Sequence, residues 1–204
     1  MLSKRNKFRL YLILQHRGSH PGFHWSIVLA PKNSNNSNTP DCYRFHVTNS
    51  AQVNAVLGTN GKFEWRFEHE PFSLVTTGNV VARILLAKIT PLRLTPTNSK
   101  ESTSWQQEIS IILDILQTVP LVQNDNSWTC RIWTIEAFHT LRGSGASQSQ
   151  GFTTIPAIEQ DQVLDLGKKA LEIIKARKKY IRAVEDIPLF DIRERPDRHN
   201  GVTP

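Results

Sequence analysis

The order of the expected secondary structure limits the fold of this chain more than any other feature of the sequence. Five segments rich in β-branched and aromatic residues come first, at 8–15, 24–30, 42–48, 62–68 and 79–89. Three segments with helical spacing of apolar residues follow, at about 104–119, 130–142 and 161–182. Strands followed by helices indicate an α+β domain. We therefore expect an antiparallel sheet of about five strands packed against three helices.

Length and composition fit one globular domain with a tail. The chain has 204 residues, of which 39% are hydrophobic and 21% charged, which is enough to bury a core. We expect a single domain over residues 1–183. The last segment, 184–204, lacks periodicity and is predicted to be a flexible C-terminal tail.

The N-terminal region is basic and then apolar, as in a signal peptide. Its apolar run at 10–14 is too short for a secretory signal or a membrane span. We therefore expect a cytoplasmic protein without a transmembrane segment. In that compartment Cys42 and Cys130, the two cysteines, are expected to be free thiols.

The net charge of +7 is concentrated near the two ends of the chain. Residues 168–182 hold seven basic residues and one acidic residue, a net charge of +6. Such a stretch can make weak contact with a nucleic acid or an anionic surface. Aromatic residues do not alternate with these basic residues as they do in RNA-binding motifs. A solvated helix surface is therefore the favoured interpretation.

The sequence DNSWTCRIWTIEAF places Cys130 in the first turn of a helix. Asp125, Ser127 and Thr129 are residues that cap a helix N-terminus, and apolar residues at helical spacing follow until Gly143. The positive end of the helix dipole favours the thiolate, which is the reactive form of a cysteine nucleophile. The same position is also typical of a small residue packed in a core.

Two of the seven histidines, His24 and His46, lie inside predicted strands. Alternation places each of them on one face of its strand. If the two strands form a hairpin, the imidazoles are cross-strand neighbours. The side of the helix that carries Cys130 is mostly apolar, so we expect it to pack on the sheet face that bears both histidines. The result would be a Cys–His–His site with His24 as the base and His46 as its orienting residue.

Three further residues are predicted to contact the substrate: Trp25, Trp128 and Gln15. Each tryptophan is also typical of a core residue, and Gln15 is a candidate donor to an oxyanion beside the backbone N–H of Cys130. The sequence predicts no metal site. Cys42 and His46 are four residues apart on one strand, which separates them by about 13 Å, too far to bind one metal ion. No phosphate-binding loop or other cofactor motif is present.

Three stretches, FHWSIVLAP, YRFHVTN and WTCRIWTIEAF, resemble the circularly permuted papain-like enzymes of the lecithin retinol acyltransferase and NlpC type. In that group a histidine strand carries the base, a second histidine follows on the next strand, and the nucleophilic cysteine opens a helix. The resemblance implies a permuted papain-like fold, with Cys130 as nucleophile, His24 as base and His46 as orienting residue.

The chain departs from that group at several points. The loop between the two histidine strands is longer, Arg131 follows the cysteine where an acidic residue is common, and no hydrophobic anchor closes the chain. Nearly the whole sequence, including LYLILQHRG and LAPK, also resembles an uncharacterised family of small fungal proteins. That second resemblance is the closer one, and it implies no chemistry.

Two functions from different classes follow. The first is a cysteine-dependent hydrolase or acyltransferase that acts on the amide, ester or thioester of a small-molecule or peptide acyl substrate, without a cofactor. The second is a non-catalytic papain-like scaffold that serves as a binding module, with the basic residues 168–182 and the segment IPLFDI as contact surfaces.

Overall fold

The computed structural model describes residues 7–18, 21–34, 39–53, 55–76, 78–90, 102–144, 151–177 and 180–193. These residues form six strands, three α-helices and two short 3-10 helices. In chain order the elements are β1 (Phe8–His16), β2 (Phe23–Ala30), β3 (Cys42–Thr48), β4 (Arg66–Phe72), β5 (Val80–Ile89), α1 (Ser102–Leu116), α2 (Cys130–Ser144), η1 (Phe152–Thr154), α3 (Gln160–Arg177), η2 (Val184–Asp186) and β6 (Leu189–Asp191).

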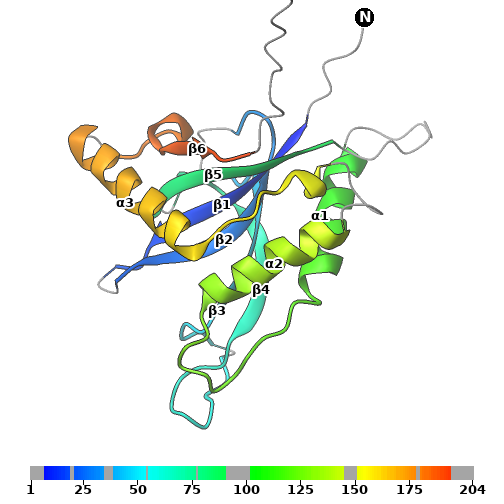
Figure 1. Ribbon diagram of the computed structural model, residues 1–204, viewed down its shortest axis with the longest axis vertical. Coiled ribbons are helices and arrows are strands. Elements are labelled where there is room, and N and C mark those ends of the chain that lie inside the picture. The colour runs from blue at the N-terminus through cyan, green and yellow to red at the C-terminus, as the bar shows by residue number, and fades with distance from the viewer. Residues whose placement is uncertain are drawn as a thin grey trace, which may run out of the picture.

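The strands form one sheet in the order β4-β3-β2-β1-β5-β6 (Figure 1). Neighbouring strands are antiparallel, except that β6 runs parallel to β5. β1 lies in the middle, and residues 10–15 of this strand are all buried. The nearly continuous apolar run LYLIL suits this position, because side chains on both faces of a central strand are covered.

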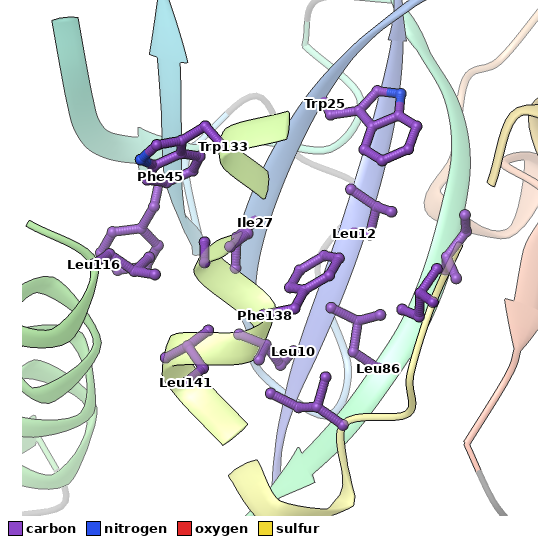
Figure 2. Close-up of a cluster of buried hydrophobic side chains, with 14 of the residues drawn as sticks. Leu10, Leu12, Trp25, Ile27, Phe45, Leu86, Leu116, Trp133, Phe138 and Leu141 are labelled. Carbon is purple, nitrogen blue, oxygen red and sulfur yellow. The ribbon is translucent and has the colours of Figure 1, made fainter. Parts of the chain in front are cut away.

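One face of the sheet packs against the helices. Figure 2 shows α2 along this face, with Phe138 and Leu141 among the apolar side chains of β1 and β2. α3 approaches so closely that a Cβ at Gly167 would lie 2.3 Å from the ring of Phe23, so only glycine fits there. The fully buried residues of this core include Leu10, Leu12, Trp25, Ile27, Phe45, Trp133 and Leu141.

The opposite face carries a second, smaller core. Side chains of β1 to β3, among them Ile13, Val28 and Cys42, pack there against η2 and the residue that follows it. Val184 and Ile187 supply the cover, and they are 4% and 1% exposed. The centre of the sheet is therefore buried on both faces, and η2 and its flanking residues belong to the domain.

The predicted α+β class and the three helices are confirmed. The expectation of a wholly antiparallel sheet of about five strands is wrong in one respect, because β6 adds a sixth strand in parallel orientation. A three-residue strand leaves no detectable alternation in the sequence, and its partner is about a hundred residues away in the chain.

The prediction that residues 184–204 form a flexible tail is wrong for residues 184–193. Arg83 fixes this segment to β5: its backbone N–H donates to Pro188 O at 2.9 Å, and its Nη2 donates to Ile187 O at 3.1 Å. The domain therefore extends beyond residue 183. The remainder of the predicted tail, 194–204, lies outside the described residues.

Two element boundaries also differ from the expectation. The fourth strand is Arg66–Phe72 and not 62–68, because it is an edge strand that tolerates Pro71. The third helix ends at Arg177 and not near residue 182. Beyond it, the carboxylate of Asp186 accepts the backbone N–H groups of Arg182 and Ala183, which holds this stretch in a turn.

α3 buries Val163, Gly167 and Ala170 and exposes Lys168 and Lys169. This arrangement fits the solvated surface expected for the basic segment, and contact with a nucleic acid or an anionic surface stays a prediction. None of the helices in the described segments combines the length and the apolar character needed to cross a bilayer.

Candidate active site

A cleft of about 1180 Å³ lies where β1, β2 and β3 meet the segment that leads into α2. Among the residues that line it are five of the six predicted site residues: Gln15, His24, His46, Trp128 and Cys130. The sixth, Trp25, has a fully buried side chain in the helix-side core, so its prediction as a substrate contact is wrong. The fold thus brings together side chains that lie up to 115 positions apart in the chain.

The two histidines are cross-strand neighbours, as the sequence predicts. His24 Nε2 lies 2.9 Å from His46 Nδ1, and the two rings meet edge to face at 83°. His46 is 5% exposed. Because this hydrogen bond occupies Nε2 of His24, Nδ1 is the nitrogen of that ring which remains available to another group.

The sheet opens at the position of Cys130. β2 and β3 are paired only from Ile27 to Leu29 on the β2 side. Trp25 lies beyond this ladder, so its backbone N–H is not used by β3 and instead donates to the thiol of Cys130. The N-terminus of α2 is therefore held against the residue that directly follows His24.

The expectation that α2 packs on the face of the sheet that bears the histidines is wrong. His24, Ser26 and Val28 share one face of β2, and Val28 belongs to the core opposite the helices. Trp25 and Ile27 point to the other face, where they pack with α2. The thiol and the histidines meet at the cleft because β2 and β3 separate there.

Cys130 is 5% exposed, and α2 begins at this residue. Burial raises the pKa of its thiol, and this effect outweighs the backbone N–H of Trp25 and the charges of Arg17 and Arg131, which lower the pKa. The expectation of a thiol with a depressed pKa is therefore wrong: desolvation opposes the helix dipole and is the larger effect. Cys130 is therefore a neutral thiol at neutral pH.

Both histidines are held in the neutral form. Burial lowers the pKa of His24 to about 4, and the positive charges of Arg44 and Arg17 act in the same direction. Burial, Arg44, His24 and Arg66 lower the pKa of His46 to about 2. At neutral pH the site is thus a neutral thiol with two neutral imidazoles, in which His24 can accept a proton.

A group of charged residues beside His46 was not found from the sequence. The Oε2 atom of Glu68 lies 3.6 Å from His46 Nε2, and Arg66 Nε donates to the other oxygen of Glu68 at 2.6 Å. Arg44 pairs with Glu70 and donates to Gln15 Oε1 at 3.2 Å. Alternation of RFEHE along β4 places Glu68 and Glu70 on one face, and this was the available signal once the strand boundary was known.

Gln15 and Trp128 occupy the cleft wall. Gln15 is paired with His24 in the β1–β2 ladder and is 6% exposed. Its Oε1 accepts a hydrogen bond from Arg44, which fixes the amide and leaves its NH₂ group for another acceptor. Trp128 packs edge to face on Trp65 at 5.1 Å, so it is both a cleft residue and a packed residue.

The residues before α2 cap it differently from the expectation. Asp125 accepts hydrogen bonds from the backbone N–H and hydroxyl of Ser127, which closes a turn before the helix. Thr129 occupies the capping position through its carbonyl, which accepts from Trp133 N at 3.2 Å. Within the described part of the chain, its buried hydroxyl has no hydrogen-bond partner.

The described residues contain no group of three histidine, cysteine or acidic side chains placed to hold a metal ion. Cys42 is a free, buried cysteine in the core opposite the helices. Burial raises the pKa of its thiol, as it does that of Cys130.

A family model covers both the domain and the cleft. The model described as "Family of unknown function (DUF6914)" matches residues 7–192. The chain belongs to the DUF6914 family. No curated protein and no solved structure matches it. The DUF6914 segment contains every residue of the candidate site, and the family description assigns it no activity.

Proposed function

We propose that this DUF6914 chain is a cysteine-dependent acyl-transfer enzyme, in which Cys130 is the nucleophile, His24 the general base and His46 the residue that orients His24. The observation that carries the proposal is the hydrogen bond of 2.9 Å between His24 and His46 in a cleft that Cys130 also lines. A base fixed by a third group beside a thiol is the arrangement that nucleophilic catalysis requires.

The neutral resting state defines the first chemical step. Cys130 Sγ forms a bond to the carbonyl carbon while its proton passes to His24 Nδ1, and the carbonyl electron pair moves to oxygen. The tetrahedral intermediate then collapses: the bond to the leaving group breaks, and His24 returns the proton to that group. The product is a thioester on Cys130. Water or an acyl acceptor attacks it in turn, with His24 again as the base, and the thiol is restored.

Donors for the oxyanion are available on two sides of the cleft. The backbone N–H groups in the first turn of α2, including that of Cys130, have no acceptor within the helix. The NH₂ group of Gln15, oriented by Arg44, is the second candidate. Preorganised donors of this kind stabilise the charge that develops on the carbonyl oxygen.

We further propose that the fold is a permuted relative of the papain-like enzymes. The order of a histidine strand, a second histidine strand and a helix that begins with the cysteine supports this relationship. We propose a hydrolase or acyltransferase of small-molecule or peptide acyl substrates that works in the cytoplasm, since both cysteines are free thiols.

The test is acylation of the protein by 4-nitrophenyl acetate at pH 7. We expect a burst of 4-nitrophenolate, and a thioacetyl group on the peptide that contains Cys130, identified by mass spectrometry. Cys130→Ala should abolish both signals. His24→Gln should slow the burst by about a hundredfold or more, in the range of general-base catalysis.

Two control variants keep the result specific. His139 is exposed on α2 and does not line the cleft, so His139→Gln should leave the burst unchanged. Cys42→Ala should also retain it, because that thiol lies in the opposite core. A Cys130→Ala protein that is still acylated at the wild-type rate would disprove the proposal.

The alternative is a non-catalytic scaffold that binds a partner, and one observation favours it. The Cys130 thiol is 5% exposed and its pKa is raised by burial, as in a structural cysteine. If the chain is a scaffold, the wild-type protein should carry no acetyl group on Cys130, although circular dichroism shows that it is folded.

A further inference from the structure

Two arginines flank the thiol in the cleft. Arg17 directly follows β1, and Arg131 is the second residue of α2. Both line the cleft together with Cys130. Among the described residues, neither guanidinium has a hydrogen-bond or ion-pair partner. Arg44 and Arg66, by contrast, are each paired with a glutamate.

The paired and the unpaired charges of the cleft therefore lie at different places. Its carboxylates near His46 are already engaged, since Glu68 pairs with Arg66 and Glu70 pairs with Arg44. At the thiol, the charges that act are positive: Arg17 and Arg131 lower the pKa of Cys130, and Arg17 also lowers that of His24. Asp125 also lines the cleft, but its carboxylate accepts two hydrogen bonds from Ser127, whereas Arg17 and Arg131 have no partner among the described residues.

The N-terminus of α2 adds to this positive end. Helix α2 has 15 residues, and no acidic residue lies in its first turn. The unpaired N–H groups of such a turn favour a negative charge. A guanidinium binds a carboxylate through two parallel hydrogen bonds, which gives orientation as well as attraction.

We propose that Arg17 and Arg131 form an anion-binding subsite beside Cys130, and that the acyl substrate carries an anionic group, such as a carboxylate, close to the carbonyl that the thiol attacks. This inference rests on the proposed function, because it names the substrate class of the same nucleophile. The subsite selects acidic acyl groups over neutral ones. The preference comes from the two arginines, which take no part in proton transfer.

The probes are iodoacetate and iodoacetamide, which differ by one negative charge. Both react with the thiolate, so the ratio of their rates cancels the thiolate fraction and reports the charge around Cys130. Rates are measured at one pH by mass spectrometry of the Cys130 peptide, with a short unstructured cysteine peptide as reference. We expect the ratio of iodoacetate to iodoacetamide rates to exceed the reference ratio by about tenfold at low salt, and to fall as salt is added.

Charge-neutral variants locate the effect. Arg17→Gln and Arg131→Gln should each lower the ratio about threefold, and the double variant should bring it close to the reference. Lys169→Gln is the matched control, because Lys169 is exposed on α3, does not line the cleft, and its loss changes the net charge of the protein equally. That variant should leave the ratio unchanged.

The outcomes separate this inference from the proposed function. A wild-type ratio equal to the reference, or an equal drop in Lys169→Gln, overturns the anionic subsite. If Cys130 is acetylated by 4-nitrophenyl acetate in a His24-dependent manner while the ratio is not raised, only the subsite fails. If neither iodo reagent modifies Cys130 in the folded protein, the subsite and the enzyme fail together.

Discussion

His24 Nε2 lies 2.9 Å from His46 Nδ1, and this hydrogen bond couples the tautomers of the two rings, because one of these nitrogens donates and the other accepts. If Nδ1 of His24 is to accept the thiol proton, Nε2 must carry the hydrogen and donate it to His46. His46 then carries its own hydrogen on Nε2, which lies 3.6 Å from Glu68 Oε2. In this tautomer the Nε2–H of His46 faces the carboxylate of Glu68 at an ion-pair distance, and the Nδ1 atom of His24 is the acceptor that the proposed mechanism requires.

Glu68→Gln tests this positioning role. In the proposed mechanism the carboxylate stabilises the Nε2–H tautomer of His46 and the positive charge on His24 during attack, and an amide would do so less well. We expect the rate of Cys130 acetylation by 4-nitrophenyl acetate to fall about tenfold, a loss of about 1.4 kcal/mol. Because the variant loses a negative charge near both rings, the pH at which acetylation is half-maximal should also shift.

The matched control for that variant is Glu64→Gln. Glu64 lines the same cleft and has the same charge, but it makes no ion pair with His46. An equal loss of rate in both variants, or an unchanged pH profile in Glu68→Gln, would show that Glu68 does not act through the histidine pair.

The pH dependence of alkylation tests the resting state of the thiol. Burial raises the pKa of Cys130, so the thiolate should become half-populated above the value of about 8.5 for a free thiol. We expect the rate with iodoacetamide to rise through pH 9 without a plateau near neutrality, measured on the Cys130 peptide in a Cys42→Ala background. A rate that levels off below pH 8 would indicate a thiolate–imidazolium pair and contradict the neutral dyad.

The histidine pair also makes stability depend on pH. In the folded protein the pKa of His24 is lowered to about 4 and that of His46 to about 2, whereas an unfolded histidine has a pKa of about 6.5. Between these values the unfolded chain binds more protons than the folded one. The free energy of unfolding should therefore be highest above pH 6.5 and fall as the pH drops toward 4.

Urea unfolding at pH 7.5 and pH 5 measures this dependence. Each histidine should contribute a loss of about 1–2 kcal/mol at pH 5. The double variant His24→Gln, His46→Gln should lose correspondingly less between the two pH values, while the remaining acidic groups affect both proteins alike. Equal losses in the wild type and the double variant would refute the assignment of this dependence to the buried pair.

Local sequence signals predict the residues of the site better than their arrangement. Alternation, together with a hairpin of the two strands, places His24 and His46 on one face, and capping residues place Cys130 at the start of a helix. Trp25 and Ile27 mark the face of β2 on which α2 packs, whereas the meeting of the thiol with the histidines depends on where β2 and β3 separate. That separation follows from pairing that ends at Ile27, and nothing in either strand's own sequence marks it.

Burial explains why the pKa of Cys130 differs from the expectation. A cysteine at a helix N-terminus is expected to ionise easily, but Cys130 also lies in the core with Trp133 and Ala137 of its own helix. Desolvation depends on the side chains that surround the thiol from other elements, which a single helix pattern does not contain. The position of Glu68 beside His46 is hidden in the same way, because it comes from the register of the β3–β4 ladder.

Ile187→Ala tests whether the segment after α3 belongs to the domain. Ile187 is 1% exposed and packs against the sheet face opposite the helices. Removing three buried methyl or methylene groups should lower the free energy of unfolding by about 2–4 kcal/mol, since the rigid sheet cannot close the cavity fully. Urea unfolding at pH 7.5 measures this loss.

Leu189→Ala is the comparison, because Leu189 lies two residues away on β6 and is 49% exposed. Its loss should cost less than about 1 kcal/mol, in line with the smaller area withdrawn from water. If both variants unfold at the wild-type urea concentration, residues 184–193 contribute nothing to stability and the tail expected from the sequence is the better description. If only Ile187→Ala is destabilised, η2 and the residue that follows it close the second core.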